Sequence, residues 1–305
     1  MKKLITLLLV SMALNPCFAK KTDLSLNLEK GKEYRQVSIT NAMVNQNVNG
    51  QKIEMIMTMG GTMIFLVKDV GENTYVMDVK YEKLSMALQM PQATMNYSSE
   101  SQDTSQIVSK VLAAMINKSF EITMSKKGKV TDIKNMDDLW LSIIESLDKL
   151  PEAQKEQVKA QIMKAYGSDA FKGNMELLTA IYPEEPVGKG DKWEVNSELK
   201  STMSAKITTK YELVELNAKY ALFTGSSIIK TEDKDASVEQ NGMPMKFDMN
   251  GSMQSTIKVD TKSGWILDAN LNQVIEGDVT IKANPQMTKE MKMGMVMKNE
   301  MHITN

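Results

Sequence analysis

The stretch MPMKFDMNGSMQSTIKVD, residues 243–260, decides the fold because it alternates between two kinds of side chain. The odd positions hold Met, Phe, Gly, Ser, Ile and Val, and the even positions hold Pro, Lys, Asp, Asn, Ser, Gln and Thr. Successive side chains of a β-strand point to opposite faces of the sheet. The stretch therefore predicts a long antiparallel strand with one buried face and one solvated face.

The same alternation recurs toward both ends of the chain. Its apolar positions are Ile53, Met55, Met57 and Met59, then Leu84, Met86, Leu88 and Met90, and near the C-terminus Met291, Met293, Met295, Met297 and Met301. Gly60-Gly61, residues 71–73 and residues 260–264 are expected to form turns. Glycine within residues 265–281, at Gly277, predicts a bend, because strands rarely exceed ~10 residues.

Between these strand-rich parts, residues 104–182 are mainly helical in pattern. An apolar stripe follows Asp103 and Thr104, either of which is expected to be the N-cap. A short hairpin is expected at 120–133, turning at Lys127-Gly128. Further helices are expected at residues 139–147, from Pro151 to Gly167, and around residues 171–182.

These patterns predict an α+β fold. Long antiparallel strands from both ends of the chain are expected to form a curved sheet or half-barrel, with the central helical segment packed against it. The expected organisation is a signal peptide at 1–19 and a single α+β domain at 20–305. Within it lie strands at 24–92, helices at 104–182 and strands at 193–304. A breaker-rich connector at 183–192 leaves open a split into two sub-domains.

The N-terminus has the pattern of a secretory signal peptide. Lys2 and Lys3 precede an apolar run at residues 4–14 that is too short to span a bilayer, and Ala19 offers a small residue for cleavage. We therefore expect a periplasmic or secreted protein. An outer-membrane lipoprotein modified at Cys17 is the alternative, but Pro16 fits poorly before a lipid-modified cysteine.

The composition of the sequence argues against several classes of function. Cys17 is the only cysteine and His302 the only histidine. Catalytic mechanisms that pair a Ser or Cys nucleophile with a His base therefore have almost no residues available. No cofactor-binding or catalytic motif is found, and we expect no enzyme activity and no cofactor. Arg35 is the only arginine and the lysines are interspersed with acids, which argues against nucleic-acid binding. No later segment is apolar enough to cross a membrane.

Methionine is the unusual residue, with 27 in the chain. One interpretation is plain core packing, although β-branched and aromatic residues suit strands better. The other is a pliable apolar face that binds a hydrophobic ligand such as a lipid acyl chain. The residues expected to form that face are Met55, Met57, Met59, Met86, Met90, Met245, Phe247, Met249 and Met253.

Two further functions stay open at this point. The first is an envelope structural or protein-interaction module, in which an edge or loop meets an envelope protein partner. The second is binding of the soft metals Cu(I) or Ag(I), which prefer thioether ligands. The residues for the metal alternative are Met291, Met293, Met295, Met297, Met301 and His302.

Three segments carry a resemblance to a known family. They are LSLNLEKGKEY at 24–34, VGKGDKWE at 187–194 and VDTKSGW at 259–265. Together they resemble an uncharacterised family of exported Gram-negative bacterial proteins, a domain of unknown function, which implies no catalytic residues. The architecture is also similar, more weakly, to the half-barrel carriers of the lipoprotein-sorting type, and that similarity implies a site for acyl chains.

Overall fold

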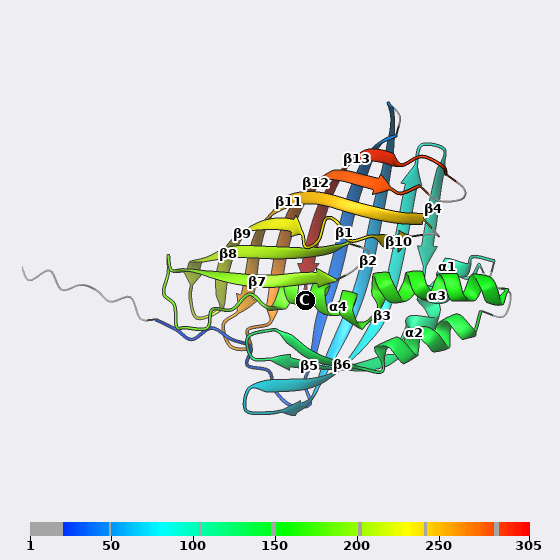
Figure 1. Ribbon diagram of the computed structural model, residues 1–305. Helices are drawn as coiled ribbons and strands as arrows, with labels where there is room; N and C mark the ends of the chain where they lie inside the picture. The colour runs from blue at the N-terminus through cyan, green and yellow to red at the C-terminus, as the bar shows by residue number, and fades with distance from the viewer. Residues whose placement is uncertain are drawn as a thin grey trace, which may run out of the picture.

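The computed structural model describes residues 21–48, 50–103, 105–147, 151–200, 203–240, 243–283 and 287–305 (Figure 1). The expected signal peptide at 1–19, Cys17 and the expected N-cap Thr104 lie outside the described residues.

Strands come first, helices and a hairpin follow, and strands return to the end of the chain. The first strands are β1 (Glu33–Val48), β2 (Gln51–Val70), β3 (Thr74–Met90) and β4 (Ala93–Ser98). The middle holds α1 (Ile107–Met115), β5 (Ser119–Ser125), β6 (Val130–Lys134), α2 (Met136–Glu145), α3 (Glu152–Tyr166) and α4 (Ser168–Thr179). The last strands are β7 (Lys192–Lys200), β8 (Ser204–Leu216), β9 (Tyr220–Thr231), β10 (Val238–Gln240), β11 (Met243–Asp260), β12 (Ile266–Ile281) and β13 (Met291–Thr304).

All of these strands belong to one 13-stranded antiparallel sheet. The order is β6-β5-β3-β2-β1-β13-β12-β11-β9-β8-β7, with β4 paired to β3 and β10 paired to β11. The first strand β1 pairs with the last strand β13 in the middle of the sheet (Figure 1). The expected fold class, with strands from both ends of the chain in a curved sheet, is confirmed.

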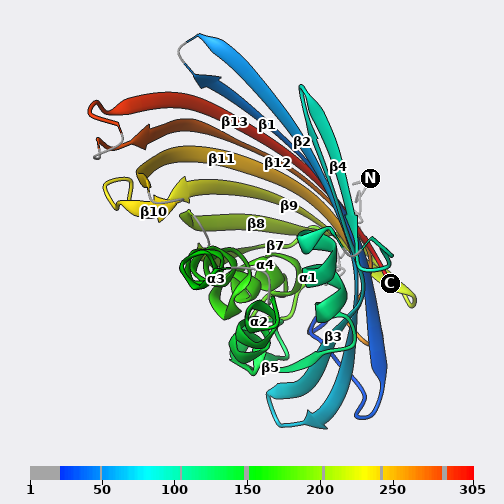
Figure 2. The ribbon, with the colours of Figure 1, turned by 90° about the vertical axis from the view of Figure 1, so that its right-hand side faces the viewer.

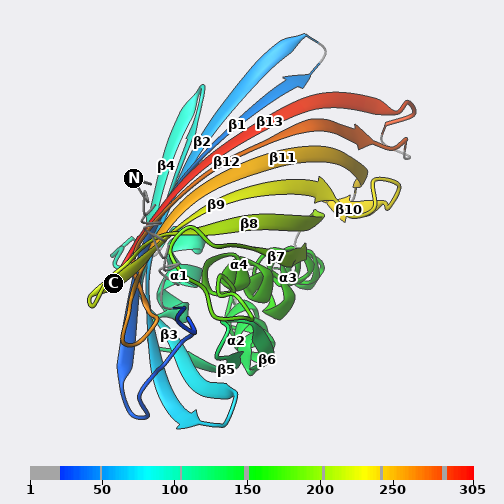
Figure 3. The same cartoon turned by 90° about the vertical axis from the view of Figure 1, so that its left-hand side faces the viewer.

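The sheet is strongly curved, and the helices lie on its concave side (Figures 2 and 3). We call this side the inner face. The helices contact mainly the strands near the two margins of the sheet, β3 to β6 on one side and β7 on the other. The central strands β1, β13 and β12 therefore lie away from the main helix contacts.

Helix α4 bridges the two margins of the sheet. On the β6 side the backbone N–H of Val130 donates to Glu176 Oε1 at 2.9 Å, and Thr179 Oγ1 donates to the carbonyl of Gly128 at 2.6 Å. On the β7 side α4 packs so closely that a Cβ on Gly173 would stand 2.9 Å from the carbonyl oxygen of Glu198. Helix α4 thus connects the two margins of the open sheet along part of their length.

The long strands correct two expectations. Gly60 and Gly61 form no turn but lie inside β2, which is paired with β1 and β3 along this stretch. A Cβ on Gly60 would stand 2.7 Å from Ser85 Oγ, so the glycine allows close packing within the strand. The second expectation is strand length: β12 exceeds ~10 residues and runs as one 16-residue strand that pairs with β11 and β13 and curves with the sheet (Figure 3).

The hairpin and the four helices lie where the patterns predict, with one correction at a cap. The N-cap of α1 is Gln106 rather than Asp103, and it makes no side-chain capping bond. The Asp103 carboxylate instead accepts bonds from the backbone N–H and the hydroxyl of Ser105, at 2.9 and 2.6 Å. These local bonds compete with helix formation and delay the start of α1.

Candidate functional site

Strand register places the side chains of the inner face in rows that cross neighbouring strands. One row joins Met253 on β11, Gln273 on β12, Asn299 on β13, Ala42 on β1 and Met57 on β2. The methionines of the described strands that share this face are Met55, Met57, Met59, Met63, Met77, Met86, Met90, Met95, Met124, Met243, Met245, Met249, Met253, Met291, Met293, Met295, Met297 and Met301. The register therefore places the expected ligand-binding residues of β2, β3 and β11 on the same face of the sheet, together with the β13 methionines of the metal alternative.

The inner face carries no charge. At the inward positions of the described strands the register places no Lys, Arg, Asp, Glu or His. Burial also raises the pKa of the inward Tyr81 to about 12, and it raises the pKa of the inward Tyr211. Both phenols therefore stay neutral at physiological pH, because a buried phenolate is disfavoured.

Burial divides the expected ligand-binding residues into two groups. Met245, Met249 and Met253 on β11 are 8%, 1% and 3% exposed and belong to the hydrophobic core. Phe247 is half-buried and packs against that core. Met55, Met57 and Met59 on β2 and Met86 and Met90 on β3 are half-buried and lie outside the core cluster. We call these last five residues, with their inward neighbours Leu88 and Met95, the methionine surface.

The residues of the metal alternative do not all meet. Met291, Met293, Met295, Met297 and Met301 share the inner face, whereas the alternation of β13 turns His302 to the outer face. There His302 Nε2 lies 2.9 Å from Asp268 Oδ2. The described residues contain no group of three or more His, Cys, Asp or Glu side chains placed to hold a metal ion. A soft-metal site on this face would therefore have to use thioethers without the histidine.

Polar side chains on the inner face are the feature that the sequence patterns left unnoticed. The amides of Gln273 and Asn299 are bonded to each other, and the hydroxyls of Thr209 and Ser227 lie 2.8 Å apart. The available signal was Asn299 itself, which interrupts the methionine series of β13. Its partner Gln273 could not be found in the same way, because it follows only from the register between β12 and β13.

Gln36 is another polar residue on the inner face, and it is 2% exposed. The described part of the chain offers its Oε1 no hydrogen-bond partner. A cavity of about 10 Å³ adjoins it, lined also by Leu26, Tyr182 and Trp265. This space is about the size of one water molecule and is too small for an organic ligand.

We predict that Gln36→Met leaves stability unchanged or raises it by about 1 kcal/mol. The substitution removes a buried acceptor without a partner and keeps a side chain of similar length. The midpoint of urea unfolding measures the effect, with the wild type as reference. A loss of more than about 1 kcal/mol would show that the Gln36 amide makes a favourable interaction in solution.

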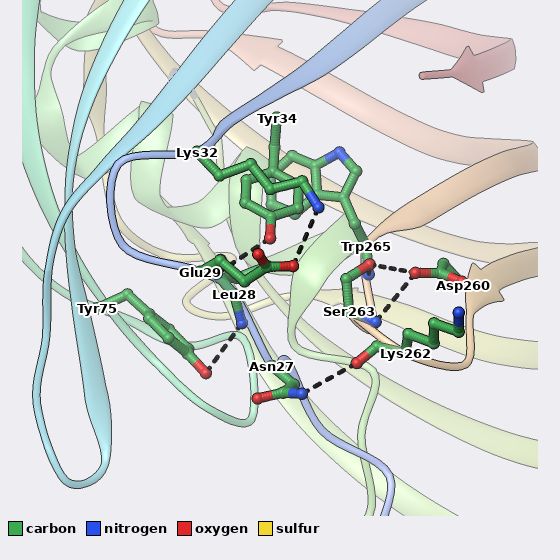
Figure 4. Close-up of polar contacts among 10 residues, drawn as sticks. All are labelled: Asn27, Leu28, Glu29, Lys32, Tyr34, Tyr75, Asp260, Lys262, Ser263 and Trp265. Atoms are coloured by element: carbon green, nitrogen blue, oxygen red, sulfur yellow. Dashed lines mark hydrogen bonds and ion pairs between the residues drawn. The ribbon is translucent and has the colours of Figure 1, made fainter.

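Two of the segments that carried the family resemblance, at 24–34 and 259–265, meet at one end of the sheet (Figure 4), which we call the capped end. The third segment, at 187–194, is linked to this end through the pairing of Val187 with Thr22. The backbone N–H of Asn27 donates to the carbonyl of Ser263 at 2.8 Å, and its side chain donates to the carbonyl of Lys262 at 3.1 Å. Thr22 and Val187 exchange backbone bonds of 2.9 and 3.0 Å. Residues 22–28 therefore cross this end and tie the central segment to the β11–β12 turn.

Aromatic side chains fill the capped end beneath this crossing segment. Trp265 packs on Tyr34 and Phe65 with ring centroids 5.2 and 5.1 Å apart, and its Nε1 donates to the carbonyl of Arg35 at 3.0 Å. The hydroxyl of Tyr75 donates to the carbonyl of Leu26 at 3.0 Å. The buried hydroxyl of Tyr182 donates to the carbonyl of Gly264. The shared motifs are thus structural parts of a cap, in contrast to the half-buried methionine surface.

A groove of about 670 Å³ lies beside the first half of β7. Part of its charged lining is paired, with Lys21 at 3.1 Å from Asp191 and Lys127 at 2.7 Å from Asp23. No methionine lines it. The groove is therefore separate from the methionine surface, and we assign no ligand to it.

Fold and inner face together define a class of protein: a curved antiparallel sheet with an uncharged, methionine-rich concave face. The chain belongs to DUF6263, a family of unknown function, whose model matches residues 72–266. This match includes the resembling segments at 187–194 and 259–265 and leaves out the one at 24–34. A comparison with curated proteins finds no match.

Among solved structures, the chain is similar to lipovitellin, in a study of its lipid–protein interactions, with a TM-score of 0.45 and 9% identity. That match covers 91% of this chain and only 25% of lipovitellin. An outer membrane channel from Pseudomonas putida F1 matches with a TM-score of 0.23 and 8% identity, over 92% and 97% of the two chains.

A domain from Vibrio parahaemolyticus, described as belonging to an outer membrane lipoprotein-sorting protein, matches with a TM-score of 0.13 and 8% identity, over 87% and 83% of the chains. At these scores the likenesses are distant and carry no functional information. Within the described ranges, no helix combines the length and the apolar character needed to cross a membrane.

Proposed function

We propose that this protein is a non-catalytic binding protein of the bacterial envelope, periplasmic or secreted, that holds a hydrophobic molecule such as a lipid acyl chain against its inner face. The observation that supports this most directly is the absence of charge at the inward positions of the described strands. An apolar ligand that binds there does not have to strip water from a charged side chain, so it avoids the free-energy cost of desolvating an ion.

The methionine surface supplies the contact. Its members are half-buried rather than sealed, so part of each side chain is accessible. Methionine has three flexible torsions and a polarizable sulfur, and it can repack around chains of differing shape. The core cluster that includes Met249 and Met253 holds the sheet in shape beside this surface. An envelope location rests on the signal-peptide pattern at residues 1–19.

The test uses methyl cis-parinarate, an uncharged fluorescent acyl ester, in direct titration of the purified protein. Met57→Glu should weaken binding at least tenfold, because it places a carboxylate on the inner face where the acyl chain would lie. The matched control is Thr58→Glu, which adds the same charge at the next residue on the outer face. We expect the control to bind as the wild type does.

Thermal unfolding of both variants accompanies the titration, so that a loss of binding is separated from a loss of structure. If the wild type does not bind the ester, or if Met57→Glu and Thr58→Glu weaken binding equally, the proposed function is wrong.

A further inference from the structure

The amides of Gln273 and Asn299 form the most central polar feature of the inner face. They lie opposite each other on β12 and β13, and Asn299 Nδ2 donates to Gln273 Oε1 at 2.6 Å. Both side chains are half-buried. On β1, Ala42 occupies the position next to Asn299, and Met57 of the methionine surface follows on β2. The amide pair therefore lies one strand away from the methionine surface.

The bond between the two amides leaves hydrogen-bonding capacity unused. A side-chain amide has two N–H donors and a carbonyl acceptor. Gln273 Oε1 and Asn299 Nδ2 are engaged with each other, and within the described ranges no further bond involves Gln273 Nε2 or Asn299 Oδ1. One donor group and one acceptor group, side by side, are thus free to bind a guest.

The surroundings of the pair decide which guest it suits. Along β13 its neighbours on the same face are Met297 and Met301, and along β12 they are Leu271 and Ile275. No inward residue of the described strands bears a charge that could compensate an ion. Burying an unpaired carboxylate or phosphate here would cost far more than burying a neutral group that is hydrogen-bonded.

We infer that the ligand is a neutral amphiphile, whose ester, amide or hydroxyl group binds the Gln273–Asn299 amide pair while its chain lies along the methionine surface. This inference rests on the proposed function and adds the chemical class of the ligand head group. A purely structural amide pair would stabilise the sheet, but its replacement would leave the order of the competing lipids unchanged.

The experiment is competition against bound methyl cis-parinarate at pH 8, where free oleate is ionised. The competitors are oleamide, monoolein and oleate, which present neutral and anionic heads on the same chain. For the wild type we expect oleamide and monoolein to compete at least tenfold better than oleate. A fourth competitor is methyl oleate, an ester without a donor, over which oleamide and monoolein should have at least a fivefold advantage in the wild type. In the double variant Gln273→Leu with Asn299→Leu, this advantage should be lost.

The matched control is Gln254→Leu, which removes an amide from the outer face of the neighbouring strand β11. It should retain the wild-type order of competitors. Should oleate compete as well as the neutral lipids, or should the double variant keep the wild-type selectivity, this inference is wrong while acyl binding stands. Failure of every probe to bind, including the ester, overturns the proposed function instead. If the double variant does not fold, Gln273→Met alone, which keeps the length of the side chain, provides the same comparison.

Discussion

Met249→Glu is expected to unfold the protein or to lower its free energy of unfolding by at least about 4 kcal/mol. Met249 is 1% exposed within the core cluster, and the inward positions of the described strands hold no cation to pair with a new carboxylate. An unpaired buried charge costs several kcal/mol, which is a large part of the 5–15 kcal/mol that is typical of whole domains. Urea denaturation followed by circular dichroism measures the change.

Asn250→Glu is the control for this prediction, because it adds the same charge at the next residue on the exposed outer face. Its stability should stay within about 0.5 kcal/mol of the wild type. A stable Met249→Glu variant would mean that this part of the face is open to water. In that case the division between the buried β11 methionines and the half-buried methionine surface would be wrong.

Trp265→Ala is expected to lower the free energy of unfolding by about 3–5 kcal/mol, the usual cost of removing a buried tryptophan. The indole fills the capped end between Tyr34 and Phe65 and is 5% exposed. It also ties β1 to the β11–β12 turn through its bond to the carbonyl of Arg35. Chemical denaturation again provides the measurement.

Trp265→Phe separates the ring from its hydrogen bond. It keeps an aromatic side chain in the capped end and loses the N–H donor, so a smaller loss of about 1–2 kcal/mol is expected. If the alanine variant is as stable as the phenylalanine variant, the cap does not depend on aromatic packing. Neither substitution touches the methionine surface, so neither should change the selectivity among lipid probes in protein that remains folded.

The alternation of side chains made the sheet predictable, because the two faces of a strand are a local property of sequence. It indicated that the methionines within each of β2, β3, β11 and β13 share one face of their own strand, whereas only the register shows that the four strands turn these faces to the same side. The turn that the glycine pair predicted at Gly60 and Gly61 was wrong, because these residues lie in a strand that is paired on both sides. A glycine pair signals a turn only if the neighbouring strands end there, and that depends on distant parts of the chain.

The candidate site was predictable only in part, for a related reason. Whether an inward methionine is sealed or half-buried depends on which helices reach it, and Met253 and Met57 look alike in the sequence. The Gln273–Asn299 pair joins residues that are brought together by strand pairing alone. A pattern within one strand cannot reveal a hydrogen bond between two strands.

The pairing of β1 with β13 has a consequence for biosynthesis. The centre of the sheet joins residues 37–47 to residues 294–304, so this edge of β1 has no partner until residues 294–304 have been made. Contacts between such distant segments also slow folding. A nascent chain therefore cannot complete the centre of its sheet until residues 294–304 have been synthesised, and this delay would suit the export that we propose for this protein.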